Sequence, residues 1–151
     1  MKQEIRLLQR KEFPRCAELW NMKKQRALAD LFYNDLCSGN RVTYVCEENG
    51  ALLGEISLVF EMNDPDYTIP LKRAYVSHLI VKKDCRRQGI GRSLVEHVIE
   101  QAQQMEIKEL TIGVDLDNFA ALRLYTKAGF DRVLVVCEDK DGRYVKLMKI
   151  I

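Results

Sequence analysis

Two glycines, Gly89 and Gly91, separate the most strand-like run of the chain, residues 74–81, from its most regular helical stripe. The stripe repeats apolar side chains at helical spacing: Leu94, Val95, Val98, Ile99, Ala102 and Met105. A second run, with alternating apolar residues, begins at Leu110. Strand, helix and strand in this order are typical of a crossover between parallel strands. This segment therefore limits the chain to folds that contain a parallel strand pair.

The remaining runs predict hairpins as well. Residues 41–46 and 52–60 read as strands on either side of Asn49-Gly50, a dipeptide typical of tight hairpin turns. We expect further strands at residues 5–8, 133–137 and 144–150, and helical segments at 13–24, with Pro14 in its first turn, at 27–36 and at 118–128. Hairpins mixed with crossovers predict one domain, residues 1–151, of the α/β or α+β class. Its central sheet is expected to be mixed, with helices on both faces.

Composition excludes several classes of function. The 24 basic and 22 acidic residues nearly cancel, which gives no general case for binding nucleic acid. Five scattered cysteines without a Cys-x-x-Cys pair indicate neither a metal site nor a disulfide framework. The sequence has no stretch apolar enough for a signal peptide or a membrane span. We therefore expect a cytoplasmic protein that uses no metal, nucleic acid or membrane.

The segment around the two glycines, Arg86-Arg87-Gln88-Gly89-Ile90-Gly91-Arg92, has the properties of an anion site. Glycines allow close approach of a ligand, and a helix N-terminus offers unpaired amides and partial positive charge. A dinucleotide fingerprint would need a third glycine where Leu94 stands, and a P-loop would need lysine in place of Arg92. The segment is therefore neither a dinucleotide-binding fingerprint nor a P-loop. A simple tight turn remains the alternative interpretation of the glycines.

A second motif lies on the helix expected at residues 118–128. Asn118 and Tyr125 are seven residues apart, nearly two helical turns, and therefore share a face with the small Ala121 between them. This spacing would leave room for a slender ligand along the helix. Taken separately, Asn118 could be only an N-cap and Tyr125 only a packed aromatic residue.

The two motifs together carry a resemblance to a known family. Arg86-x-x-Gly89-x-Gly91 and Asn118-x-x-Ala121-x-x-Leu124-Tyr125-x-x-x-Gly129-Phe130 are similar to the pyrophosphate loop and the following helix of the GNAT superfamily of acyl-CoA-dependent N-acetyltransferases. The order of elements fits from Ile5 to Ile150, so the resemblance covers essentially the whole chain. It implies a single GNAT-like domain whose sheet is mostly antiparallel, and acetyl-CoA as the cosubstrate.

The resemblance also implies roles for individual residues. The pantetheine arm would pair with the backbone of Leu79, Ile80 and Val81. Asn118 would hydrogen-bond the pantetheine or thioester end, and Tyr125 would donate a proton to the departing thiolate as general acid. A phenol is protonated at neutral pH and can serve this thiolate. The pyrophosphate would be bound by the loop residues Arg86, Arg87, Gln88, Gly89, Ile90, Gly91 and Arg92.

The sequence constrains the identity of the general base and of the acceptor amine less than it constrains the cosubstrate. His78 on the central strand is one candidate for deprotonating the amine, and Glu55, acting through water, is another; a histidine satisfied by local hydrogen bonds is the alternative for His78. The family branch that modifies protein N-termini has a glutamate where this chain has Gly113, which argues against that branch.

The acceptor itself is expected to be a small-molecule or peptide amine. The acidic residues Asp64 and Asp66, and others at 138–141, could attract such a cation or could be solvated loop charge. A homodimer is possible on the resemblance. A non-catalytic acyl-CoA sensor is the rival function, and an unrelated nucleotide-binding module is a third hypothesis.

Overall fold

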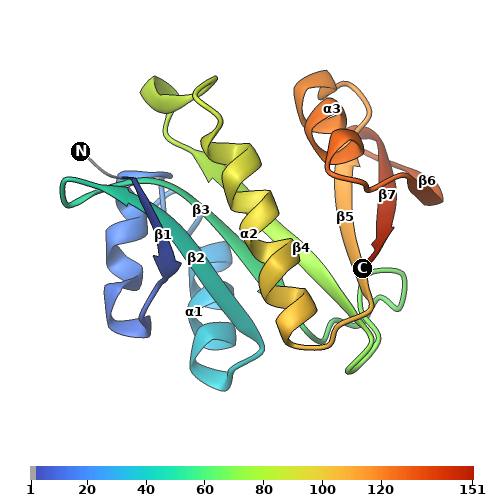
Figure 1. Cartoon of the computed structure of the whole chain (residues 1–151), viewed down its shortest axis with the longest axis horizontal. Helices are drawn as coiled ribbons and strands as arrows, with labels where there is room; N and C mark the ends of the chain where they lie inside the picture. The colour runs from blue at the N-terminus through green and yellow to red at the C-terminus, as the bar shows by residue number, and fades with distance from the viewer. Residues whose placement is uncertain (1–2) are drawn as a thin grey trace. The chain divides into compact units, whose positions relative to one another are not determined.

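The computed structural model describes residues 3–151, and its elements follow the predicted order (Figure 1). In chain order they are β1 (Glu4–Leu7), η1 (Arg10–Glu18), α1 (Arg26–Ser38), β2 (Arg41–Glu48), β3 (Ala51–Val59), β4 (Arg73–Val81), η2 (Lys83–Cys85), α2 (Ile90–Gln104), β5 (Glu109–Asp115), α3 (Phe119–Lys127), β6 (Arg132–Asp139) and β7 (Gly142–Ile150). The strands form one seven-stranded sheet in the order β1-β2-β3-β4-β5-β7-β6. β4 and β5 pair in parallel, and β1–β2, β2–β3, β5–β7 and β6–β7 pair antiparallel. The prediction of an α/β fold with a mixed, mostly antiparallel sheet is confirmed.

The chain divides into two compact units. The first takes in the chain up to Val59 together with Ser77–Val98, and the second takes in Phe60–Val76 and Ile99–Ile151. The assignment of residues 1–151 to one domain stays a prediction. No helix among residues 3–151 is both long enough and apolar enough to cross a membrane.

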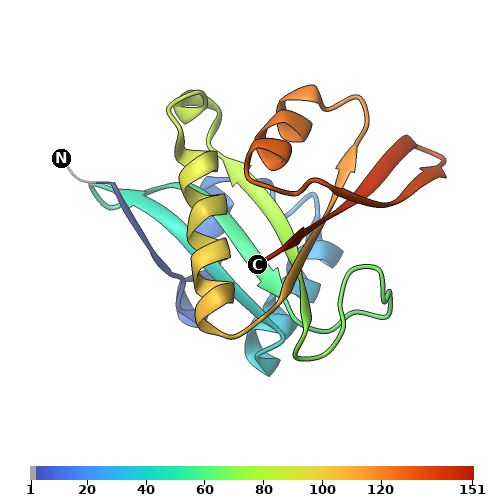
Figure 2. The same ribbon diagram turned by 45° about the vertical axis from the view of Figure 1, so that its right-hand side comes forward.

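The first unit contains the predicted hairpin of β2 and β3. Asn49 and Gly50 have φ angles of 53° and 80°, the left-handed conformations that a two-residue turn of this kind requires. One face of the strands packs on η1 and α1 around a cluster that includes Phe13, Phe32 and Val45. The other face is covered by the first turns of α2, as Figure 2 also shows. Helices on both faces are thus found within this unit.

The helical segment expected at residues 13–24 differs from the prediction. It is a 3-10 helix that begins at Arg10 and ends at Glu18, and Pro14 lies inside it rather than in its first turn. Proline lacks the N–H that a continuous α-helix would use, and the shorter 3-10 segment tolerates this loss. The next helix, α1, agrees with its prediction and ends at Gly39, whose φ of 82° gives the left-handed stop.

The second unit contains β5, α3 and the hairpin of β6 and β7 (Figure 2). Leu110, Ile112 and Val114 are buried as expected from their alternation. Met105, predicted to belong to the apolar stripe of α2, is instead 40% exposed. The reason is local: α2 ends at Gln104, and the left-handed Glu106 (φ 63°) turns the chain towards β5.

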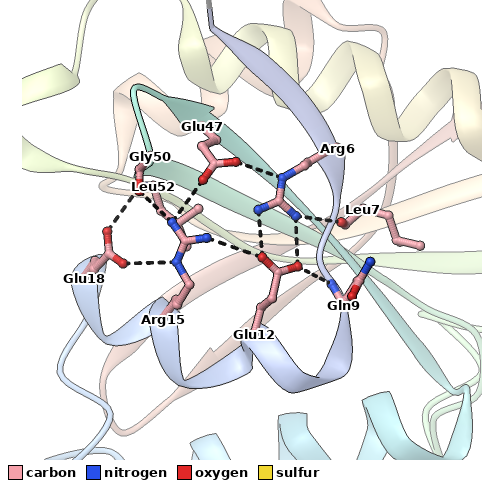
Figure 3. A network of polar contacts seen from close by, with 9 residues as sticks. All are labelled: Arg6, Leu7, Gln9, Glu12, Arg15, Glu18, Glu47, Gly50 and Leu52. Atoms are coloured by element: carbon pink, nitrogen blue, oxygen red, sulfur yellow. Dashed lines mark hydrogen bonds and ion pairs between the residues drawn. The ribbon is translucent and has the colours of Figure 1, made fainter.

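A network of charged side chains ties β1 and η1 to the β2–β3 hairpin in the first unit (Figure 3). Arg6 donates two hydrogen bonds to Glu12, of 2.8 and 2.9 Å, and a third to Glu47, of 3.0 Å. Arg15 bridges Glu47 at 3.1 Å and the carbonyl of Gly50 at 2.8 Å. Hydrogen bonds from Arg6, and then from Arg15, hold the pKa of Glu47 below its ordinary value. Forked guanidinium contacts of this kind are stronger than single ion pairs.

We expect Glu12→Gln to lower the free energy of unfolding at pH 7 by about 1 kcal/mol. The hydrogen bonds from Arg6 are the largest cause that lowers the pKa of Glu12, from 4.5 to about 2. Because the folded pKa lies below the unfolded one, the stabilisation is complete above about pH 5 and is lost as the pH falls towards 2. Urea unfolding of both proteins at pH 7 and at pH 3 measures this difference.

The matched control is Asp30→Asn, which removes the exposed pair between Arg26 and Asp30 on α1. That change is expected to alter stability by no more than about 0.5 kcal/mol. If Glu12→Gln lowered the free energy of unfolding equally at pH 7 and at pH 3, the stabilisation would not come from the charge of the Glu12 carboxylate.

Candidate functional site

The glycine segment forms an exposed loop between η2 and α2 in the first unit. Arg87 and Gly89 both adopt left-handed backbone conformations, with φ angles of 66° and 83°. The N–H of Ser93 donates to the carbonyl of Gly89 at 3.0 Å, which is the first hydrogen bond of α2. The helix therefore supplies no backbone partner for the preceding amides of Ile90, Gly91 and Arg92. A side chain added at Gly89 would meet nothing within 4 Å, so the space above the loop is open to a ligand.

Three arginines surround this loop. Arg86, Arg87 and Arg92 are all exposed. The Nε of Arg86 donates to the carbonyl of Val81 at 3.2 Å, which ties the loop to the end of β4. Arg92 pairs with Glu96 one turn later on α2, at 3.1 Å. The loop thus combines free space, helix-terminal amides and guanidinium groups, the donor set suited to a diphosphate.

The end of β4 is joined to the loop through the short helix η2. Leu79, Ile80 and Val81 are half-buried. The carbonyl of Ile80 faces Gly54 on β3, where an added Cβ would lie 3.0 Å from that oxygen. Close packing of the two backbones at this point explains why β3 carries a glycine in its interior.

His78 lies within β4, immediately before these residues. Its φ is 58°, a left-handed value that is rare for a non-glycine residue in a strand. Its Nδ1 lies 3.8 Å from Oε2 of Glu55 on β3, so the structure brings the two candidate bases together. Glu55 is only 2% exposed. The reading of His78 as satisfied by local hydrogen bonds is wrong for Nδ1, which has no such partner among the described residues.

Asn118 and Tyr125 belong to the second unit. Asn118 caps α3, and its Oδ1 accepts a hydrogen bond from the N–H of Ala121 at 3.1 Å. Asn118 is therefore an N-cap, and its Nδ2 group is left to donate to a ligand. Tyr125 is 6% exposed and meets the ring of Phe130 edge-on at a centroid distance of 5.9 Å. Burial raises the pKa of the Tyr125 phenol above its ordinary value.

Two more tyrosines lie near this helix and were not expected at the site. Tyr75 on β4 lies close enough to Tyr125 to contribute, after burial, to its raised pKa, and the centre of its ring is 4.6 Å from that of Tyr67. The Tyr67 hydroxyl fills the space directly above Gly113, where any side chain would collide with it. The position at which one family branch has glutamate is thus covered by a phenol here.

The acidic residues Asp64 and Asp66 share one lysine as their partner. Both accept hydrogen bonds from Nζ of the buried Lys146, at 2.7 and 3.0 Å. The hydrogen bond from Lys146 lowers the pKa of Asp64, and its partner carboxylates raise the pKa of Lys146. Lys146 supplies one positive charge against these two carboxylates, so the expectation that they could attract a cationic acceptor stays a prediction that rests on the one remaining negative charge. Within residues 3–151, no group of three or more His, Cys, Asp or Glu side chains is arranged to hold a metal ion.

The predicted site residues thus fall into two sets. The loop, the end of β4, Glu55 and His78 come together in the first unit, whereas Asn118 and Tyr125 come together in the second. The sequence analysis did not predict the aromatic neighbours of His78, Trp20 and Phe32, because these residues lie far from it in the chain.

The sequence profile described as the acetyltransferase (GNAT) family matches residues 2–130. The chain belongs to this family. The predicted resemblance to the GNAT superfamily is thereby confirmed. Among curated relatives, the GNAT chain is 30% identical over 105 residues to N-acetyltransferase family 8 member 3 of Rattus norvegicus. That match takes in 70% of this chain but only 45% of the rat protein, so the chain spans about half the length of this relative.

Solved structures agree on the fold of this GNAT chain. An IAA acetyltransferase from Bacillus cereus ATCC 14579 superposes with a TM-score of 0.77 at 19% identity, covering 99% of this chain and 100% of the other. A GNAT family acetyltransferase from Elizabethkingia anophelis with acetyl-CoA bound gives a TM-score of 0.74 at 19% identity, with 99% and 98% covered. At this level of identity the likeness establishes the GNAT fold.

Proposed function

We propose that this protein is an acetyl-CoA-dependent N-acetyltransferase that moves the acetyl group to a primary amine by direct nucleophilic attack. The observation that carries the proposal is the loop from Arg86 to Arg92, with two left-handed residues and the start of α2 beneath open space. Membership of the GNAT family supports it, as does a relative with acetyl-CoA bound.

The residues fit such a cosubstrate. The amides at the start of α2 and the side chains of Arg86, Arg87 and Arg92 would bind the pyrophosphate. The backbone of Leu79, Ile80 and Val81 would hydrogen-bond the pantetheine arm, and Asn118 would use its Nδ2 group towards the thioester end. Acetyl-CoA supplies the activated acyl group as a thioester.

Tyr125 is the proposed general acid for the departing thiolate. Its buried phenol stays protonated throughout the neutral range, so a donor is always present. The same burial makes complete proton transfer to sulfur less favourable than in water. We therefore assign most of the effect to a hydrogen bond that strengthens as negative charge develops on sulfur.

Calorimetry with acetyl-CoA, CoA, ATP and NAD tests the binding half of the proposal. We expect the two coenzyme A compounds to bind and the two nucleotides to bind far more weakly. Tight binding of ATP without binding of CoA would instead favour an unrelated nucleotide-binding module.

The transfer half is tested by CoA release with a panel of primary amines, both small molecules and peptides. We expect release with at least one acceptor class and none without an amine. Tight acetyl-CoA binding with no release across the panel would favour a non-catalytic acyl-CoA sensor over the enzyme.

A further inference from the structure

Glu55 on β3 is a buried carboxylate whose charge is poorly compensated. It is 2% exposed, and its Oε1 has no hydrogen-bond partner among the described residues. Its other oxygen, Oε2, lies 3.8 Å from Nδ1 of His78. This nitrogen atom is also buried and has no hydrogen-bond partner among the described residues. Buried polar atoms left without a partner cost stability, so they are rare unless they serve a function. The pair therefore calls for a functional explanation.

The left-handed backbone of His78 is what directs the imidazole towards Glu55. In a regular strand, consecutive side chains point to opposite faces. Here Ser77 accepts hydrogen bonds from Arg41, whose guanidinium lies 3.6 Å from the centre of the Phe32 ring. His78 contacts the same Phe32 ring, at a centroid distance of 5.0 Å. Two successive residues of β4 thus face one side, a strained arrangement of the kind that clusters at functional sites.

Two aromatic rings fix the orientation of the imidazole. Trp20 meets His78 edge-on at 4.6 Å, and Phe32 meets it at a similar angle. The side chain of His78 is 15% exposed although its Nδ1 is buried, so the exposed part of the ring is away from Glu55. One ring nitrogen, Nδ1, therefore faces the carboxylate, and the exposed part of the side chain is not at this nitrogen.

The other charged or titratable groups around this imidazole do not compete with Glu55. Arg41, from β2, is directed to Ser77 by both of its terminal nitrogens, at 2.7 and 3.0 Å. Cys16, from η1, lies close enough to feel the charge of Glu55, and burial raises the pKa of its thiol, which keeps it neutral. Among the described residues, Glu55 is the acidic group within ion-pair distance of His78, at 3.8 Å.

We propose that His78 is the base that deprotonates the acceptor amine and that Glu55 is its positioning residue. This inference rests on the acetyltransferase function proposed above. At 3.8 Å the negative charge of the Glu55 carboxylate favours the tautomer of the neutral imidazole that carries its proton on Nδ1, which leaves the lone pair on Nε2 for the substrate. The 3.8 Å separation shortens to a hydrogen bond when the imidazolium forms, as is common for catalytic contacts in the absence of substrate.

The proton balance of the reaction is complete with these groups. The acceptor ammonium gives one proton to Nε2 of His78, and the amine lone pair then forms the N–C bond with the thioester carbonyl. The C–S bond breaks, sulfur leaves with the electron pair, and the nitrogen loses a second proton. Tyr125 gives its proton to sulfur and regains, through solvent, the second proton lost by nitrogen, and the first proton passes from His78 to solvent. The net products are the amide, CoA and one released proton.

The chain has two histidines, which makes the tautomer of His78 directly measurable. Nitrogen-15 NMR of the full chain, with His97→Gln as the variant that assigns the signals, reports which ring nitrogen carries the proton. We expect neutral His78 to be protonated on Nδ1 in the wild type. In Glu55→Gln, a same-sized change, we expect a shift towards the Nε2–H form. A wild-type His78 protonated on Nε2, or a tautomer that Glu55→Gln leaves unchanged, would overturn the inference without any activity measurement.

Kinetics with two kinds of acceptor provide the second test. With an amine that is protonated at the assay pH, Glu55→Gln and His78→Gln are expected to lower kcat/KM by about 10²-fold or more. With an amine of low basicity, already unprotonated at that pH, both variants should retain most of the wild-type rate. Equal losses with both acceptors would refute the base role. A wild-type protein that binds acetyl-CoA but acetylates neither amine would refute the proposed function instead, and the NMR result would still decide the arrangement of the pair.

Discussion

Tyr125→Phe is expected to lower kcat by about 10²-fold or more while acetyl-CoA affinity changes little. The substitution removes one hydroxyl and keeps the ring that packs on Phe130, so the fold around α3 should be preserved. The loss falls on the transition state because the proposed hydrogen bond to sulfur strengthens only as the C–S bond breaks. Single-turnover kinetics, in which the chemical step is observed directly, together with calorimetry of acetyl-CoA binding, measure the two quantities separately.

The pH dependence gives an independent check on Tyr125. A general acid must be protonated to act, and burial moves the pKa of this phenol upward from 10. Loss of the donor is therefore expected only above pH 10, so Tyr125 should cause no decline in kcat at lower pH. A basic limb near neutral pH that disappears in Tyr125→Phe would contradict this assignment.

Tyr33→Phe is the matched control for Tyr125. Tyr33 is a tyrosine of α1 that is 41% exposed, and it belongs to the first unit. The same loss of one hydroxyl there is expected to leave both kcat and acetyl-CoA affinity unchanged. If Tyr125→Phe turned over acetyl-CoA as fast as Tyr33→Phe under single-turnover conditions, Tyr125 would not be the acid.

Gly89→Asp is expected to weaken acetyl-CoA binding by at least about tenfold, which corresponds to about 1.4 kcal/mol. The new carboxylate would stand at the helix-terminal amides proposed to bind the pyrophosphate, where it would repel the phosphates and occupy their space. A Cβ added at this position meets no protein atom within 4 Å, so a clash of the Cβ within the protein is not a competing cause. Calorimetric titration with acetyl-CoA and with CoA measures the effect.

Backbone strain is the competing cause, and Gly50→Asp controls for it. Gly50, at the β2–β3 hairpin, has a φ of 80° against 83° for Gly89, and it too has open space around it. Both substitutions place aspartate in a left-handed conformation and should cost similar stability. Only Gly89→Asp should reduce coenzyme affinity, and a similar reduction in Gly50→Asp would assign the effect to general destabilisation.

Local sequence patterns were sufficient for most of the fold. The Asn49-Gly50 turn, the alternation of Leu110, Ile112 and Val114, and the glycine stop of α1 each depend on neighbouring residues. Such patterns act through propensity and periodicity, which a sequence displays directly. The errors concern the bounds of the first helical segment and the exposure of Met105 just beyond the end of α2, where a few backbone angles decide the outcome.

The sequence by itself determined the order of the elements, the family, and the loop and helix motifs proposed to bind the cosubstrate, because these depend on residues close together in the chain. Only the tertiary structure decided which distant side chains meet. It paired Lys146 with Asp64 and Asp66, placed the Tyr67 hydroxyl over Gly113, and turned His78 towards Glu55 through one left-handed residue in β4. Contacts of this kind link residues tens of positions apart and follow from packing and a single backbone angle, neither of which leaves a periodic signal in the sequence.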